Sequence, residues 1–148
     1  MDGEAAQDQQ ELYNQLAYYT LAHGDRRFIH QHVVDAFAVQ NADANTKPIA
    51  GAFGLFGLFL HIERGYSGRD VQRAHMRLAK RRKQWPRFEL PRDRGDVSAA
   101  EVLAAQPGPE RDEAIESWCR SVWQACAAIQ QQVRNLFDDV LPGDRKEL

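Results

Sequence analysis

Apolar residues recur every three or four positions along most of the chain, which is the spacing of one face of an α-helix. Leu12, Leu16 and Tyr19 show this spacing near the N-terminus. Glycine, proline and polar stretches separate the periodic segments, and alternating strand patterns are scarce. We therefore predict an all-α protein, a single-domain helical bundle with a central apolar helix and a long C-terminal helix. The expected helices span residues 9–22, 26–42, 48–65, 68–84, 98–105 and 109–141.

The segment 48–65 is apolar on nearly every side, so we expect it to be the central helix. One side carries large residues, whereas the other is nearly bare at Ala50, Gly54 and Gly57. A glycine inside a helix costs about 1 kcal/mol relative to alanine. Two glycines on one face therefore predict that another backbone approaches closely there. His61 projects from the same bare side.

Three short patterns predict where helices begin. Asp25 precedes the segment 26–42 and suits an N-cap. Ser67-x-x-Asp70 and Ser98-x-x-Glu101 both have the spacing of a capping box.

The last predicted helix carries an apolar seam whose spacing alternates between four and three residues, as in a coiled coil. Such a helix would be about 50 Å long at ~1.5 Å per residue, so either it kinks or part of the seam packs on another chain. We expect a homodimer through the 115–140 seam, with Trp118 and Trp123 beside it; the alternative is that the seam only covers the other helices. The seam residues are Ile115, Cys119, Val122, Cys126, Ile129, Val133, Leu136 and Val140.

Length and composition fit one globular domain over residues 1–148, with residues 1–8 and 143–148 as tails. Hydrophobic residues make up 43% and charged residues 27% of the chain, which argues against wholesale disorder. The uncharged stretch within 48–62 is 15 residues long, shorter than the ~20 that a membrane span needs. The first ten residues are polar, without the apolar core of a signal peptide, so we expect a cytoplasmic protein with no membrane association.

Cys119 and Cys126 lie seven residues apart on one predicted helix. Their Cα atoms would be about 10.5 Å apart, too far for a disulfide between them. Burial in the apolar seam raises the pKa of a thiol, so nucleophilic cysteine chemistry is not expected.

Histidines project from or near the apolar faces of four predicted helices. Helical bundles build metal sites in this way, with ligands from facing helices. We take His23, His32, Asp35, His61 and His75 as candidate ligands of a divalent metal ion, or as an acid–base cluster. The alternative is that these side chains are buried and satisfied by hydrogen bonds. No HExxH or CxxC motif decides between the two.

Positive charge is concentrated in one segment. Residues 64–94 contain eleven basic and three acidic residues, a local balance of +8 in a chain of net charge −2. The candidate anion-binding residues, all on the outward side of the helix at 68–84, are Arg69, Arg73, Arg77 and Lys80. A phosphate-bearing partner or nucleic acid would suit this face, with Trp85 and Phe88 available for stacking. The alternative is a solvated face, or one docked on acidic residues of a second chain.

Several stretches resemble the signature of a bacterial family of small proteins with no assigned function. They are YTLAHGD at 19–25, FIHQHVVDAFAVQ at 28–40, HIERGYSGRDVQRAHMRL at 61–78 and WP at 85–86. Some relatives carry a cysteine-bearing N-terminal extension that this chain lacks, so any metal role of those cysteines does not carry over. The resemblance implies no activity. The sequence thus favours a self-associating helical protein of unknown role, with metal binding and anion binding as the alternatives.

Overall fold

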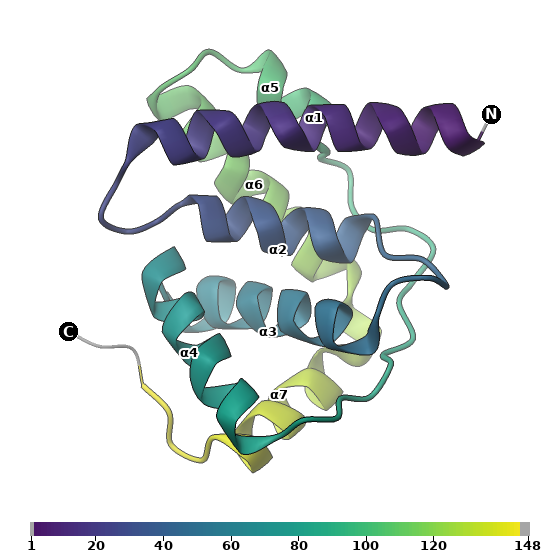
Figure 1. The fold of residues 1–148 in the computed structure, drawn as a ribbon, viewed down its shortest axis with the longest axis vertical. Helices are drawn as coiled ribbons and strands as arrows, with labels where there is room; N and C mark the ends of the chain where they lie inside the picture. Colours follow the sequence, from purple (N-terminus) through teal and green to yellow (C-terminus); the bar gives the residue numbers. More distant parts are fainter. Residues whose placement is uncertain (1, 146–148) are drawn as a thin grey trace.

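The computed structural model describes residues 2–145, with side chains from residue 8 onward. Over that range the chain forms seven α-helices and one 3₁₀ turn, and no strand (Figure 1). This confirms the predicted all-α, single-domain architecture. The elements are α1 (Asp2–His23), α2 (His30–Gln40), α3 (Pro48–Arg64), α4 (Gly68–Arg81), α5 (Ala99–Ala104), α6 (Pro109–Ala125), η1 (Ala127–Ile129) and α7 (Gln130–Val140).

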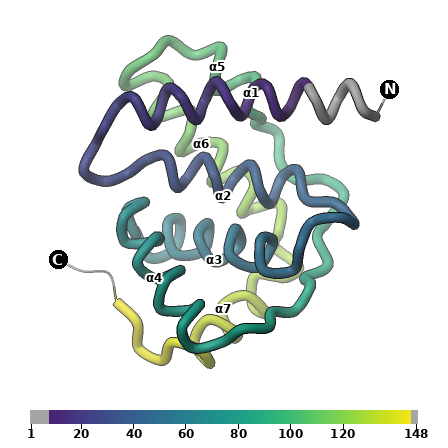
Figure 2. Tube along the Cα trace, in the orientation of Figure 1, coloured from purple at the N-terminus to yellow at the C-terminus, as the bar shows by residue number. Residues whose placement is uncertain are grey.

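Helix α3 is the central element, as its apolar sequence predicts. It contacts α2, α4, α6 and α7. Figure 2 shows α1, α2 and α3 lying in succession, with α4 and α7 beyond α3. The side chains of Leu55, Phe56 and Leu60 are completely buried. Since a helix that is apolar all round must be covered all round, the other helices are arranged about α3.

The bare side of α3 faces α2 at close range, which confirms the predicted backbone approach. A Cβ atom added to Gly54 would lie 3.0 Å from Cγ2 of Val39 on α2. A Cβ atom added to Gly57 would overlap the carboxyl group of Asp35. Any larger side chain at these positions would push α2 and α3 apart.

The start of α2 differs from the prediction. The helix begins one turn later than expected, because the chain first passes through a turn with Phe28 at φ 60°. Asp25 accepts a hydrogen bond from the Ile29 amide at 3.2 Å within this turn, but it is not the N-cap residue. The turn is held by α4, where the Arg69 amide donates to the Arg27 carbonyl at 2.9 Å. This long-range contact outweighs the helical pattern of residues 26–29.

One of the two predicted capping boxes forms. At the start of α4, the side chain of Ser67 accepts from the Asp70 amide, and the Asp70 side chain accepts from the Ser67 amide. At the start of α5, Ser98 is the N-cap residue but makes no side-chain cap hydrogen bond, so that prediction is wrong. Helix α4 ends at Arg81 rather than at residue 84.

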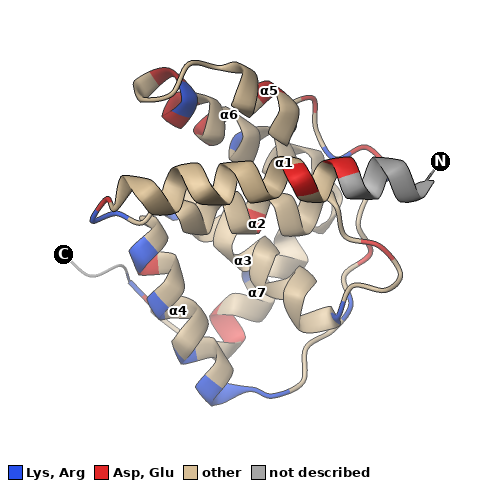
Figure 3. Cartoon of the chain, turned by 45° about the horizontal axis from the view of Figure 1, so that its top comes forward, with Lys and Arg blue, Asp and Glu red and all other residues tan. Residues whose placement is uncertain are grey.

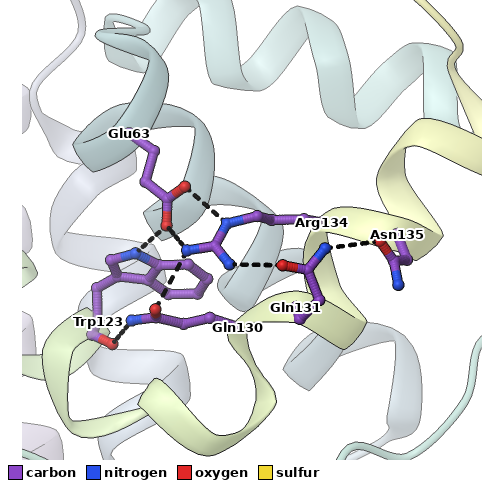
Figure 4. A network of polar contacts seen from close by, with 6 residues as sticks. All are labelled: Glu63, Trp123, Gln130, Gln131, Arg134 and Asn135. Carbon is purple, nitrogen blue, oxygen red and sulfur yellow. Dashed lines mark hydrogen bonds and ion pairs between the residues drawn. The ribbon is translucent and has the colours of Figure 1, made fainter.

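The long C-terminal helix kinks at Cys126, where the 3₁₀ turn η1 separates α6 from α7. Side chains hold the elbow between α6 and α7 (Figure 4). Gln130 Nε2 donates to the Trp123 carbonyl at 2.9 Å. Both Trp123 and Arg134 donate to Glu63 at the end of α3, with Arg134 forming two hydrogen bonds of 2.8 and 2.7 Å. The kink was one of the two alternatives open from the sequence, and it folds α7 back onto α3.

The apolar seam is used inside the chain. Six of its eight residues are buried, and Leu136 and Val140 pack against the core from its edge. Trp118 and Trp123 are 0% and 2% exposed. The seam therefore covers the other helices, and the homodimer stays a prediction that light scattering would test.

The ends of the domain are partly outside the described residues. Helix α1 begins at Asp2, seven residues before the predicted start, so most of the expected tail 1–8 is helical. Of the expected tail 143–148, residues 146–148 lie outside the described range, as does residue 1. Among the described residues, no helix combines the length and apolarity that crossing a bilayer requires.

Two glycines of α3 give a matched prediction about the α2–α3 contact. We expect Gly57→Ala to lower the free energy of unfolding by about 1–3 kcal/mol or more, because its methyl group overlaps the Asp35 carboxyl. Gly51→Ala should raise it by about 0.5–1 kcal/mol, because no atom lies within 4 Å of the new Cβ and alanine favours the helix. Urea denaturation measures both. Equal effects of the two substitutions would contradict the close packing.

Candidate functional site

His61, near the C-terminal end of α3, is held between two hydrogen-bond acceptors. Its Nδ1 lies 2.8 Å from the carbonyl oxygen of Tyr66, and its Nε2 lies 2.5 Å from Oε2 of Glu116 on α6. A carbonyl oxygen only accepts, so Nδ1 carries a hydrogen. The hydrogen bond with His61 lowers the pKa of Glu116, so this carboxyl is ionised at neutral pH. The contact therefore joins Nε2 of the His61 ring to an ionised carboxylate.

His32 on α2 stacks directly on His61. The two ring centroids are 3.6 Å apart and the planes differ by 19°. Burial, and then the neighbouring His61, lowers the pKa of His32 to about 3. His32 is thus a neutral imidazole near physiological pH. No described residue forms a hydrogen bond with either of its ring nitrogens.

Asp35 lies one turn after His32 on α2 and is 2% exposed. Gln31 Nε2 donates to its Oδ1 at 3.1 Å, whereas its Oδ2 is buried without a partner among the described residues. Burial raises the pKa of Asp35 well above its usual value, so the neutral carboxyl is favoured. Its neighbour across the contact is Gly57, one turn before His61.

Cys119 on α6 completes this group. Its Sγ donates to the His32 carbonyl at 3.6 Å, and burial raises the pKa of the thiol well above its usual value. The thiol is therefore not poised as a nucleophile, in agreement with the sequence analysis. We call the group formed by His32, Asp35, His61, Glu116 and Cys119 the histidine cluster.

Two of the five predicted ligands lie elsewhere. His75 on α4 donates from Nε2 to the Phe53 carbonyl at 2.8 Å, and burial lowers its pKa to about 4. It is the buried, hydrogen-bonded histidine of the alternative interpretation. His23 is exposed at the end of α1, where its Nε2 lies 4.0 Å from Asp112. The fold thus brings together His32, Asp35 and His61 only.

The histidine cluster is not a preformed ligand cage. Among the side chains described, those of residues 8–145, no three or more His, Cys, Asp and Glu are grouped so that they hold a metal ion. The arrangement offers one shared proton, between His61 and Glu116, and one neutral imidazole beside it. These are groups that exchange protons or bind metal ions after a local side-chain movement.

Sequence reasoning missed Glu116. It lies next to Ile115 of the seam and one turn before Arg120, whose Nη2 is 3.4 Å from Glu116 Oε1. From spacing alone this is an ordinary surface ion pair at i, i+4. Only the packing of α6 across the end of α3 shows that its other oxygen meets His61.

The predicted basic face lies along α4, and Figure 3 shows its blue Lys and Arg residues continuing into the loop that follows. Part of the Arg77 guanidinium is already engaged within the chain, because Asp144 accepts hydrogen bonds of 2.9 and 3.1 Å from it. Arg69 lies over the Phe28 ring at 5.4 Å. Arg69, Arg73 and Lys80 are exposed. The face is thus partly neutralised by the C-terminal segment.

Asp35 gives a prediction about pH. Its pKa in the folded state lies above the unfolded value of 3.8. As pH rises from about 4, the unfolded chain releases this proton while the folded chain retains it, so the stability falls until the folded pKa is passed. Asp35→Asn removes the ionisable group and with it this pH-dependent loss of folding stability. The stability difference between variant and wild type should therefore grow between pH 5 and pH 8, by up to about 1.4 kcal/mol per pH unit.

Urea denaturation at both pH values measures the difference. Asp139→Asn, at an exposed position on α7, is the control and should show no pH-dependent difference. A difference that stays constant or shrinks with rising pH for Asp35→Asn would mean that Asp35 is ionised in the folded protein.

Comparison with known proteins adds family membership. No curated protein and no solved structure matches the chain significantly. The profile of a family described as "Family of unknown function (DUF5946)" matches residues 6–127. That range contains the whole histidine cluster and ends within η1, before α7. The match spans most of the sequence and agrees with the resemblance of the histidine-containing stretches. The chain therefore belongs to the DUF5946 family, a family of unknown function.

Proposed function

We propose that the protein binds a divalent transition metal ion at the histidine cluster, with His61 and Glu116 as the first two ligands. The observation that carries the proposal is the contact between His61 Nε2 and Glu116 Oε2 at 2.5 Å. An imidazole nitrogen and a carboxylate oxygen, which are both common metal ligands, already face each other there. The ion takes the place of the proton that they share.

The surroundings of His61 support this role. Metal-ligating histidines usually donate their other ring N–H to a carbonyl or a carboxylate, which fixes the ring and its tautomer. The 2.8 Å contact between His61 Nδ1 and the Tyr66 carbonyl is of this kind. The Glu116 side chain is 41% exposed and the His61 side chain 12% exposed, so an ion reaches the pair from solvent on the Glu116 side.

His32 is the third ligand in this proposal. Its ring is neutral, which is the form that binds metals, and turning it breaks no hydrogen bond with a described residue. The movement needed is a rotation that replaces the stack on His61 by coordination of the same ion. Asp35 and Cys119 remain behind the ligands as buried neutral groups.

The test is metal uptake by the intact chain without an affinity tag. Titration calorimetry with Zn²⁺ and elemental analysis after dialysis should give about one ion per chain. Glu116→Gln and His61→Ala should each weaken Zn²⁺ binding at least about tenfold, since even the partners that orient metal ligands contribute 10- to 100-fold. His23→Ala, which removes an exposed histidine away from the cluster, is the matched control and should bind like wild type.

Thermal unfolding without metal shows that each variant is folded before it is titrated. No uptake of Zn²⁺, Co²⁺ or Mn²⁺ by the wild type would overturn the proposal. Uptake that Glu116→Gln leaves unchanged, or that His23→Ala removes, would also overturn it.

A further inference from the structure

A hollow that lies apart from the histidine cluster is found where three segments meet. It is lined by the connector between α2 and α3, by the first turns of α3 and by the loop at 87–94. Its volume is about 220 Å³. A cavity of about 150 Å³ already accommodates benzene, so this hollow has room for one aromatic ring and a small substituent. We call it the connector pocket.

Basic residues outnumber acidic residues in the lining of the connector pocket. Its charged lining residues are Lys47, Arg87, Arg94 and Asp43. Neither the Lys47 side chain nor the Arg87 side chain forms a hydrogen bond or ion pair with another described residue, although the Lys47 carbonyl accepts from the Ala50 and Gly51 amides. Asp43 faces its own loop, where Oδ1 accepts from the Asn45 amide at 2.8 Å. The lining therefore has two cations without an anionic partner.

Arg94 adds a fixed positive charge. Its guanidinium donates to the carbonyls of Val39, Gln40 and Ala42 at the end of α2, at 3.1, 3.3 and 2.6 Å. These neutral acceptors hold the side chain in place and leave its charge without a carboxylate. The loop at 87–94 is thereby attached to α2, which keeps the pocket wall in position.

Apart from Thr46, the uncharged residues of the lining are apolar or glycine. Leu55 is fully buried beneath the pocket, and Phe88 is half-buried at its wall. Gly51 leaves open space where a side chain would stand, because no atom lies within 4 Å of an added Cβ. An apolar floor with a few convergent polar groups is the usual composition of a small-molecule site.

We infer that the connector pocket binds a small organic anion, with one aromatic or branched apolar body and a carboxylate or phosphate group. The apolar body lies on Leu55 and Phe88, and the anionic group faces Lys47 and Arg87. The inference does not depend on metal binding, because no residue of the histidine cluster lines this pocket. It also differs from the predicted basic face, since none of Arg69, Arg73, Arg77 and Lys80 lines it.

Three probes of the same shape test the charge preference. Benzoate, benzamide and benzamidine are planar single-ring compounds that carry a negative, a zero and a positive charge. Ligand-observed NMR should show binding of benzoate, weaker binding of benzamide and none of benzamidine. Benzoate binding should weaken as NaCl is raised, because partly exposed charges are screened by salt. Equal binding of benzoate and benzamidine, or no binding of benzoate at millimolar concentration, would overturn the inference.

Variants locate the site. Gly51→Leu fills the open space while replacing a helical glycine, so it should abolish benzoate binding and leave the melting temperature unchanged or higher. Lys47→Ala and Arg87→Ala should each weaken binding about two- to fivefold, the range for exposed charges. Arg92→Ala, in the same loop but outside the lining, is the control. Benzoate binding that survives in folded Gly51→Leu places the ligand elsewhere and refutes the assignment.

Discussion

Helices α2 and α3 lie in contact because the face of α3 toward α2 carries Gly54 and Gly57. The absence of side chains at these two positions sets the short distance between α2 and α3, which carry His32, Asp35 and His61 of the histidine cluster. Asp35 occupies the space that a side chain at position 57 would need. The same approach brings His32 on α2 over His61, one turn after Gly57. Helix α6 then closes this contact with Trp118, Cys119 and Glu116. Packing of small residues therefore determines where the polar chemistry lies.

The polar groups of the core differ in how they are accommodated. Gln40 is fully satisfied, since it accepts from Trp118 Nε1 at 2.9 Å and donates to the Val97 carbonyl at 2.7 Å. His75 is likewise satisfied by one backbone carbonyl. Asp35 is not, because its Oδ2 is buried without a partner among the described residues. His32 contacts the cluster through its stack on the His61 ring. Buried polar atoms normally have partners. Trp85 Nε1 is the other buried atom without one among the described residues, but only Asp35 lies beside stacked histidines, which makes the histidine cluster the candidate site.

Charge is distributed in two ways that bear on partners. Along α4 the basic face is partly offset within the chain, where Asp144 pairs with Arg77 and also accepts from Tyr66 at 2.7 Å. Around the connector pocket, the Arg94 guanidinium donates only to neutral carbonyls, and Asp43 is the one acidic residue of the lining. Within the basic segment 64–94, Arg77 on α4 is thus paired with a carboxylate, whereas Arg94 at the pocket donates only to carbonyls. The metal site that we propose at the histidine cluster and the anion site that we infer at the connector pocket share no residue.

The sequence by itself determined the helical class, the central place of α3, the close approach at its glycines, the capping box at Ser67 and the inert state of both cysteines. These features follow from local spacing and side-chain size, which a linear pattern contains. Only the tertiary structure decided the later start of α2, the elbow at Cys126 and the meeting of His61 with Glu116. Residues 126–129 contain neither glycine nor proline, and contacts of Glu63 and Gln130 set that bend. The contact of His61 with Glu116 joins residues 55 positions apart and that of Glu63 with Arg134 joins residues 71 apart, so no periodicity in the chain encodes them.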